Sequence, residues 1–236
     1  MHDVLAQDQL YMTVDILILT VRDGRLHLLL ARRAKPPYEG RWALPGSFIR
    51  VHESAEGTVK RLLEEMLPIQ NAFFEQLYTF TAEDRDPRGR VISIAYLAIV
   101  PWGNLKRLIA EEEISFRCWQ ADMDESGLRL TDDGSAALLP EDLAFDHGKI
   151  IETGIERLRG KIDYTDIGFR FLENPRAFSL SELQTVFEAV LGKTLDSSNF
   201  RRAILNRYEK TGRLTQTVLA EQRGRGRPAV LYRIND

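Results

Sequence analysis

The sequence predicts an α/β protein built from two modules, a strand-rich module in residues 1–150 and a helical module in residues 151–236. Three observations predict this organisation. Aliphatic and β-branched runs separated by turn residues fill most of the first part. A helical spacing of apolar residues replaces them after Pro140. The balance of charge also reverses between the two parts, as expected when two modules face different surroundings.

The first part reads as strands around one helix. Thr13–Val21 is aliphatic and β-branched and ends at the hairpin turn Asp23-Gly24, so Arg25–Ala31 is expected to return beside it. Ser54–Leu67 is expected to be a helix, stopped by Pro68. Further strands are expected at Ala72–Thr81 and Val91–Val100, with a short hairpin at Leu128–Leu139. This pattern is typical of an α/β/α sandwich.

Composition excludes several classes of protein. The chain has 236 residues with 44% hydrophobic and 28% charged residues, which is ordinary for a soluble globular protein. Its longest apolar run, Val91–Trp102, is too short to cross a bilayer, so no membrane partner is expected. Cys118 is the single cysteine, which excludes an intrachain disulfide, and no signal segment opens the chain. These features predict a cytoplasmic location.

The net charge of −3 conceals an asymmetry. Residues 150–236 hold 15 Lys and Arg against 11 Asp and Glu, whereas the first 149 residues hold 17 against 24. Within Lys193–Arg233 the count is 10 basic to 3 acidic residues. A basic segment joined to an acidic module indicates a polyanionic partner for the second module, although a solvated basic face would give the same count.

The second part predicts a pair of helices joined by a short turn. After a helix at 146–159 closed by Gly160, Ser179 and Glu182 form a capping box that starts the next helix, and Gly192 ends it. Asp196 is a good N-cap for a following helix that runs to about Tyr208. A short helix is also expected at 164–172.

The last of these helices has two different faces. Its apolar residues share one arc, and its polar residues share the opposite arc, a layout typical of a helix-turn-helix whose second helix enters the major groove. An ordinary helical hairpin would show the same spacing. The candidate DNA-binding residues on this helix are Ser198, Asn199, Arg201, Arg202 and Asn206.

A basic hairpin strengthens the DNA-binding interpretation. Arg213–Glu221 and Ala229–Arg233 read as strands, and the segment between them alternates arginine with glycine. Such a hairpin is the wing of a winged helix-turn-helix, and its arginines can contact phosphates or enter a narrow minor groove. Arg223, Arg225 and Arg227 are the candidates. Double-stranded DNA is favoured over RNA because no aromatic platform is interleaved with these residues.

Gly46–Ile69 resembles the Nudix box, the metal-binding signature of a family of nucleotide hydrolases. Anchored on Ala43–Phe48 and Glu53-Ser54, Arg61 falls on the family's arginine. Its three helical glutamates, spaced to share one helix face, correspond here to Leu62, Glu65 and Met66. Sliding the register by one residue recovers two acids, but it places residues without a carboxylate at other acid positions of the box. The magnesium site is incomplete in both registers, so we expect binding without efficient catalysis, no catalytic residues and no metal.

Both modules together resemble the Nudix-related transcriptional regulators of NAD metabolism, the NrtR family. The resemblance covers nearly the whole chain and rests on four segments in the same order and spacing. It implies an N-terminal Nudix-like α/β/α sandwich with a C-terminal winged helix-turn-helix domain. It also implies a homodimeric repressor of NAD synthesis or salvage genes, bound to a palindromic operator and released by ADP-ribose or a related metabolite. The segments are Glu39–Phe48, Arg85–Val91, Leu143–His147 and Gly224–Ala229.

The resemblance and the chemistry of ADP-ribose together indicate candidate ligand-binding residues. A pyrophosphate calls for guanidinium donors. We expect these from Arg41, Arg88 and Arg90, with Glu53 and Glu65 lining the remains of the metal site. Asp86 is a candidate acceptor for ribose hydroxyls, and Tyr38 or Phe48 a candidate platform for adenine, although a core role for Phe48 is favoured.

Two alternatives stay open. An active ADP-ribose pyrophosphatase of the Nudix type would carry the basic tail as an accessory. A regulator of the same architecture would respond instead to a sugar-derived effector, or would have a vestigial pocket. The sequence does not determine the operator or the preferred metabolite.

Overall fold

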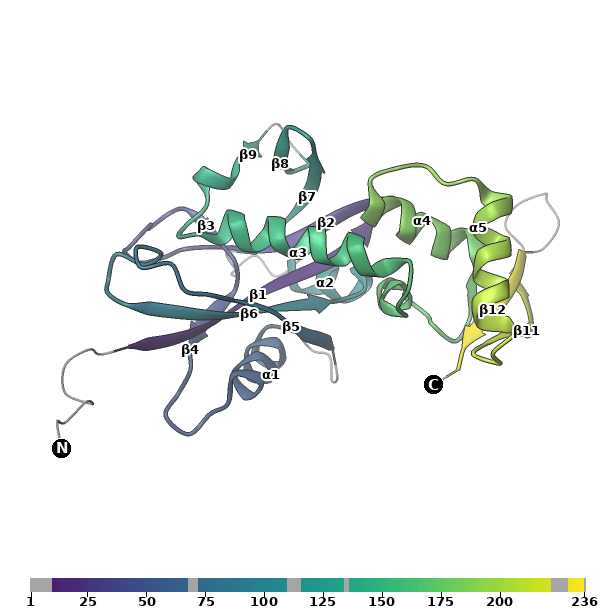
Figure 1. Ribbon diagram of the computed structural model, residues 1–236, viewed down its shortest axis with the longest axis horizontal. Coiled ribbons are helices and arrows are strands. Elements are labelled where there is room, and N and C mark those ends of the chain that lie inside the picture. Colours follow the sequence, from purple (N-terminus) through teal and green to yellow (C-terminus); the bar gives the residue numbers. More distant parts are fainter. Residues whose placement is uncertain (1–9, 68–71, 110–115, 134–135, 222–228, 236) are drawn as a thin grey trace.

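The computed structural model describes residues 10–67, 72–109, 116–133, 136–221 and 229–235 (Figure 1). A mixed sheet forms the centre of the first module and has the order β5-β6-β1-β2-β7-β8-β9. Two short strands, β3 (Trp42–Ala43) and β4 (Gly46–Phe48), pair with β2 and β1 beside this path. The strands of the main path are β1 (Tyr11–Arg22), β2 (Arg25–Arg32), β5 (Phe73–Phe80), β6 (Val91–Ile99), β7 (Phe116–Asp124), β8 (Gly127–Thr131) and β9 (Ala137–Leu138).

Strand β1 is the central strand and is buried on both faces. It pairs with β2 through the predicted hairpin, in which Asp23 and Gly24 both have positive φ angles. On its other side it pairs in parallel with β6. Leu17 and Leu19 point to one face of the sheet, and Ile16 and Ile18 point to the other, as the period of two in a strand requires.

Helices cover both faces of the sheet, which confirms the predicted sandwich. Helices α1 (Ala55–Met66) and α2 (Trp102–Ile109) pack on the face that holds Ile16, through side chains such as Val59 and Leu105. Helix α3 (His147–Ile162) lies along the opposite face, over Leu17 and Leu19 (Figure 1). Helix α1 begins at the N-cap Ser54, whose hydroxyl accepts a bond from the backbone of Gly57.

Most of the predicted strands are confirmed, and several elements were not foreseen, among them helix α2 and strand β7. Helix α2 is short and follows the predicted strand Val91–Val100 almost directly, in a segment to which the sequence analysis assigned no element. Strand β7 carries acids and an arginine within its nine residues, which obscured its pattern, yet it pairs with both β2 and β8. Tertiary packing, more than the local pattern of residues, determines that these two segments form a helix and a strand.

Helix α3 spans the predicted boundary between modules and corrects the expected end of a helix. Residue 150, predicted as the boundary between modules, lies inside this helix, and Ile150 is fully buried against the first module. The helix also continues through Gly160, where a cap was predicted. The last turn forms because Ile162 is buried with no exposed surface, and this packing outweighs the weak helix propensity of a single glycine.

The C-terminal module has the predicted winged-helix order of elements. The turn Ile167–Phe171 is a 3-10 helix, shorter than the helix expected at 164–172. Helix α4 (Leu180–Leu191) has the predicted capping box and ends at Gly192, whose φ angle is 67°. Helix α5 (Ser197–Ile204) continues into a π-helical turn (Leu205–Glu209). The strands β10 (Phe178–Ser179), β12 (Ala229–Ile234) and β11 (Leu214–Glu221) form a small sheet in that order.

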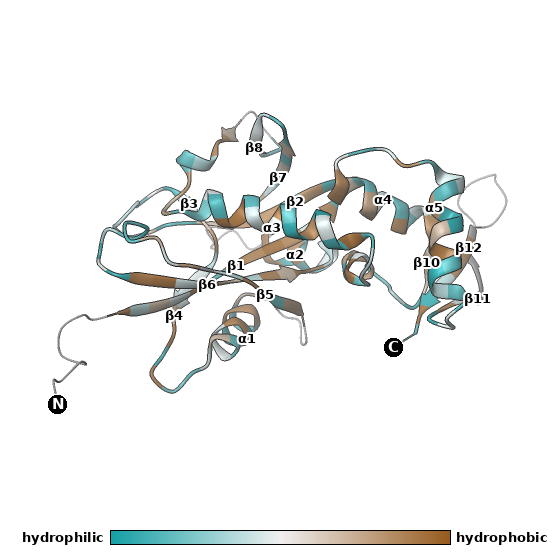
Figure 2. Cartoon of the chain, viewed as in Figure 1, coloured by the Kyte–Doolittle hydropathy of each residue, from teal (hydrophilic) through white to brown (hydrophobic). Residues whose placement is uncertain are grey.

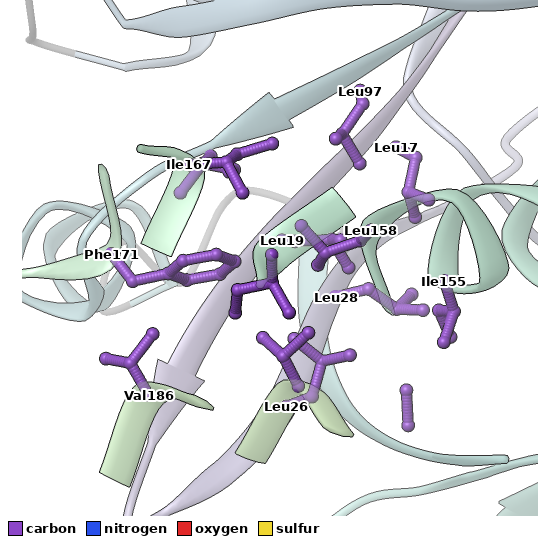
Figure 3. Packing of buried hydrophobic residues seen from close by; sticks show 14 of the residues in the cluster. Leu17, Leu19, Leu26, Leu28, Leu97, Ile155, Leu158, Ile167, Phe171 and Val186 are labelled. Atoms are coloured by element: carbon purple, nitrogen blue, oxygen red, sulfur yellow. The ribbon is translucent and has the colours of Figure 1, made fainter. Parts of the chain in front are cut away.

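One hydrophobic core runs through both modules. Leu26 of β2 lies near Val186 of α4, while Leu158 of α3 and Phe171 pack around Leu19 (Figure 3). In Figure 2 the hydrophobic residues of the strands and of α4 meet at this joint, whereas α5 beyond it is largely hydrophilic. The two modules are therefore joined by packing as well as by the chain, and residues of the sheet, of α3 and of the C-terminal helices share one core.

This continuity predicts that the modules unfold together. Leu158→Ala should lower the free energy of unfolding by about 2–5 kcal/mol, because it removes buried methyl groups and leaves a cavity at the joint. In urea titrations, tryptophan fluorescence reports the first module, since Trp42, Trp102 and Trp119 all lie there, and circular dichroism reports both modules. We expect coincident transitions. Arg157→Ala, on the exposed face of the same helix, is the control, and two separate transitions in the wild type would contradict this prediction.

Candidate functional site: a cationic cavity and an exposed helix

A cavity of about 720 Å³ opens at one end of the sheet, beside the N-terminus of α3. This volume lies within the range of small-molecule sites, roughly 300–1,000 Å³. Its walls come from β1, β4, the loop after β2, the loop before β6 and the segment leading into α3. The lining residues are Thr13, Asp15, Arg33, Lys35, Leu44, Gly46, Ser47, Phe48, Arg85, Asp86, Arg88, Phe145 and His147.

The base of the cavity is a buried network around Asp15. The hydroxyl of Ser93 donates to its carboxylate at 2.5 Å, and Nε2 of His147 lies 3.5 Å from its other oxygen. The backbone N–H of Leu44 donates to Nδ1 of His147 at 2.8 Å, which places the ring proton of a neutral imidazole on Nε2, towards Asp15. Burial raises the pKa of Asp15, but His147, Ser93 and Arg85 outweigh burial and lower it to about 2.

Close packing of two strands holds this base in place. Asp15 on β1 lies opposite Gly46 on β4. A Cβ atom at Gly46 would collide with the Asp15 carboxylate and with the backbone carbonyl of Val14, so this position requires glycine.

Arg85 connects the cavity to helix α3. Its side chain is only 3% exposed and makes a bidentate pair with Asp146, with contacts of 2.7 and 3.1 Å. Its Nη2 also lies 3.4 Å from the Asp15 carboxylate. These bonds use Nε and Nη2 and leave Nη1 for another acceptor. Because the carboxylate of Asp146 binds Arg85, it does not cap the helix that Asp146 precedes.

The upper part of the cavity concentrates positive charge. Arg88 forms a bidentate pair with Asp86 at 2.6 and 2.9 Å. Burial lowers the pKa of Arg33, and repulsion by Arg88 lowers it further, which indicates that the two guanidinium groups share one electrostatic environment. Among the described residues, no carboxylate lies within ion-pair distance of Lys35. A multiply charged anion fits this arrangement.

Aromatic rings flank these cations. The guanidinium of Arg88 lies 5.1 Å from the ring of Phe48 and 5.5 Å from that of Phe145, and Arg33 lies 4.7 Å from the latter. Tyr38 packs edge-on against Phe145, with centroids 4.9 Å apart. The cavity therefore combines flat apolar surfaces with guanidinium donors.

The structure brings together some of the predicted ligand-binding residues and separates others. Asp86, Arg88 and Phe48 line the cavity, and Tyr38 supports its wall. Arg41 lies outside and donates to the backbone carbonyl of Glu141 at 3.0 Å, while Arg90 donates to that of Thr81 at 2.8 Å. Both guanidinium groups are used in holding loops, so their part in ligand binding stays a prediction.

The two predicted acids of the Nudix-like segment, Glu53 before α1 and Glu65 on it, also lie outside the cavity lining. Glu53 accepts two bonds from Arg61, at 2.8 and 3.0 Å, and a third from Thr58. The bonds from Arg61, followed by that from Thr58, lower the pKa of Glu53 to about 2. Glu65 is 56% exposed and lies 3.6 Å from Arg61.

These acids do not form a magnesium site with their neighbours. Leu62 and Met66 are half-buried and pack against the core beneath α1. Within the described ranges, no three Asp, Glu, His or Cys side chains lie close enough together to hold a metal ion. Magnesium in nucleotide sites commonly binds through one or two carboxylates together with substrate phosphates, so the expected absence of magnesium stays a prediction.

The predicted DNA-binding residues of the helix share an exposed face. Ser198, Asn199, Arg202 and Asn206 are exposed on α5 and its π-helical extension, while Phe200 and Ile204 are buried behind them. Arg201 is also exposed, and its guanidinium donates to the hydroxyl of Tyr232 at 3.1 Å. The geometry matches that of a recognition helix.

The wing is only partly described. Strands β11 and β12 pair as predicted, with a register shift between Gln216 and Ala220. The predicted phosphate contacts Arg223, Arg225 and Arg227 lie outside the described residues.

None of the described helices is long and apolar enough to cross a membrane.

Several cavity residues were missed by the sequence analysis. Asp15 had a visible signal, since it is the one charged residue within the predicted strand Thr13–Val21. Phe145 and His147 lay in a segment used for the family resemblance, without an assigned role. Arg33 and Lys35 follow a strand and carry no local signal, because only the fold brings this loop to the cavity.

Comparisons with known proteins match both modules. A Nudix domain model matches residues 11–136, and a model of the NrtR DNA-binding winged helix domain matches residues 168–234. The ADP-ribose-responsive transcriptional repressor NtrR of Acinetobacter baylyi is 32% identical over 94% of this chain and 81% of its own. All of α3 lies between the two matched regions.

Two further similarities cover different parts of the chain. The crystal structure of Shewanella oneidensis NrtR with a 27mer DNA superimposes with a TM-score of 0.76 at 32% identity, over 95% of this chain and 93% of that one. The ADP-ribose pyrophosphatase of Methanocaldococcus jannaschii is 34% identical over 53% of this chain and 63% of its own length.

The buried network predicts a specific dependence of stability on pH. The pKa of Asp15 is about 2 in the folded protein, against 3.8 for a carboxyl group free in water. The ionised carboxylate thus contributes about 2 kcal/mol, present above about pH 4 and lost as pH falls towards 2. In urea titrations, Asp15→Asn should be less stable at pH 7 and lose this part of the acid dependence. Asp23→Asn, at an exposed turn, should behave like the wild type. If the free energy of unfolding of Asp15→Asn fell with decreasing pH as steeply as that of the wild type, the assignment of this acid dependence to Asp15 would be contradicted.

Proposed function

The chain belongs to the NrtR family, and from that membership and the cavity we propose that it is a transcriptional repressor that binds operator DNA and is released by ADP-ribose. One observation carries this proposal. A single continuous core joins a cavity lined by cations and aromatic rings to an exposed recognition helix. The regulated genes are proposed to serve NAD synthesis or salvage, as the family resemblance implies.

The chemistry of the cavity supports ADP-ribose as the ligand. Its pyrophosphate carries two negative charges, which we assign to Arg88, Arg33 and Lys35, with Arg85 beneath them. The adenine ring has apolar faces that suit Phe48 or Phe145. Asp86 is assigned as an acceptor for hydroxyl groups of a ribose.

The C-terminal module supports double-stranded DNA as the partner. Helix α5 is proposed to enter the major groove with its exposed face, while the arginines of the wing contact the adjacent backbone. We further propose that two copies of the chain bind a palindromic operator, since two recognition helices related by a dyad match two half-sites.

We propose that the Nudix domain binds its ligand without efficient hydrolysis and needs no magnesium. Support comes from Leu62 and Met66, which pack into the core, and from Glu53, which is held by Arg61. The similarity to an ADP-ribose pyrophosphatase favours the alternative of an active enzyme. Magnesium-dependent turnover of ADP-ribose that Glu65→Gln abolishes would establish that alternative.

Fluorescence anisotropy tests the central proposal. The labelled probe is an operator fragment from the upstream region of the protein's own gene, titrated with and without saturating ADP-ribose. We expect tight binding that ADP-ribose weakens, because the ligand prefers an arrangement that the operator does not. Arg88→Ala should require about 10- to 100-fold more ADP-ribose, since a charge-assisted bidentate contact is lost.

Two controls sharpen this measurement. Arg129→Ala, at an exposed position on β8, should respond like the wild type. Simple sugar phosphates should have no effect, and a response to them in place of ADP-ribose would favour the sugar-derived effector. Operator binding that no concentration of ADP-ribose changes would overturn the proposed effector but retain the DNA-binding module.

Arg202→Ala tests the recognition helix. The side chain is exposed on α5, so its loss should cost about 1–3 kcal/mol of operator binding if it meets a base edge, and should relax sequence preference there. Arg225→Ala in the wing should weaken binding to all sequences alike and reduce the dependence on salt. Competition assays with operator and scrambled duplexes measure both effects. Unchanged affinity in both variants would place the DNA surface elsewhere.

A further inference from the structure

We propose that helix α3 is the element that couples the ligand cavity to the DNA-binding helix, and that Arg159 is the positioning residue at its far end. This inference rests on the proposed function, since it concerns how ligand binding in the cavity reaches the operator. It is carried by contacts at both ends of α3 and at its middle. Figure 1 shows α3 running from the cavity end of the sheet, near β3, to the C-terminal module.

The first end of α3 is built into the cavity. Asp146 immediately precedes the helix and holds Arg85, and His147 is its first residue and faces Asp15. Both Arg85 and His147 line the cavity. An anion that binds Nη1 of Arg85 draws the guanidinium away from Asp146, so a change in ligand occupancy acts directly on the start of the helix.

The middle of α3 rests closely on the sheet. A Cβ atom at Gly154 would collide with the side chain of Leu17 on β1, so the helix approaches this strand as near as its backbone allows. Gly154 lies near the centre of the 16-residue helix, which is about 24 Å long. A rigid helix held at its middle tilts as one body, and a shift at the cavity end produces an opposite shift at the other end.

The far end of α3 is bonded to the DNA-binding module. The guanidinium of Arg159 donates to the backbone carbonyl of Val190 at 3.0 Å and to that of Met123 at 2.9 Å. Val190 belongs to the last turn of α4, so Arg159 caps the C-terminus of that helix, where a positive charge is favoured. One side chain therefore links α3, the sheet and α4.

The segment that follows α3 reaches the recognition helix itself. Arg207, in its π-helical extension, donates to the carbonyl of Asp163. The hydroxyl of Tyr208 donates to the carbonyl of Thr165 at 3.0 Å. A displacement of the end of α3 thus moves both helices of the helix-turn-helix through hydrogen bonds and through the shared core.

A coupling measurement with Arg159→Ala tests this inference. The quantity is the ratio of operator Kd values with and without saturating ADP-ribose, which for allosteric proteins is roughly 5- to 150-fold. Arg159 lies outside the cavity and the DNA-binding face, so the Kd for ADP-ribose alone should stay within about twofold of wild type, while the ratio should fall towards one. The reciprocal ratio, ADP-ribose Kd with and without operator, should fall by the same factor.

Two variants accompany this test. Arg157→Ala removes an exposed arginine from the same helix and should keep the wild-type ratio. Tyr208→Phe removes only the hydroxyl that reaches Thr165 and keeps the buried ring, so it tests the same link if Arg159→Ala fails to fold. A wild-type ratio in correctly folded Arg159→Ala and Tyr208→Phe would overturn the inference and leave the proposed function intact. A ratio of one in the wild type would overturn both.

Discussion

The packing of α3 across one face of the sheet is the interaction on which the rest of the molecule depends. Buried aliphatic side chains of this helix, among them Ile155 and Leu158, lie against β1 and β2, and the same cluster continues into α4. If the helix were anchored to only one module, the cavity and the DNA-binding helix would be joined by a segment of chain alone. With this packing they are parts of one folded unit.

Much of this fold could be predicted from local patterns. The hairpin at Asp23-Gly24, the capping box at Ser179 and the glycine at the end of α4 each act within a few residues, and each is present as expected. The end of α3 could not be predicted in the same way. Gly160 looks like a stop signal, but burial of Ile162, which depends on the distant sheet, extends the helix by another turn.

The candidate site was less predictable than the fold, for a related reason. Arg88 and Asp86 were expected from one motif, and the structure places both at the cavity. Arg41 came from another recognised motif, and its guanidinium donates to a backbone carbonyl outside the cavity lining. The residues at the base of the cavity come from positions 15, 85 and 147, and only the register of β4 beside β1 and the placement of α3 bring them together. Spacing along the chain holds no trace of such long-range proximity.

The pair between Asp86 and Arg88 has a consequence for selectivity. The carboxylate of Asp86 is 3% exposed and already occupies the guanidinium fork that an incoming anion needs. A ligand that binds the Nε and Nη2 side of Arg88 must therefore displace an intramolecular competitor that is present at fixed, high effective concentration. A single weak anion gains little binding free energy from that exchange. A ligand with two adjacent charges pairs with the guanidinium of Arg88, and its hydroxyl groups bond the released carboxylate of Asp86, so it gains free energy at both residues. The unliganded protein thus discriminates against abundant simple anions by holding its own counter-ion in place.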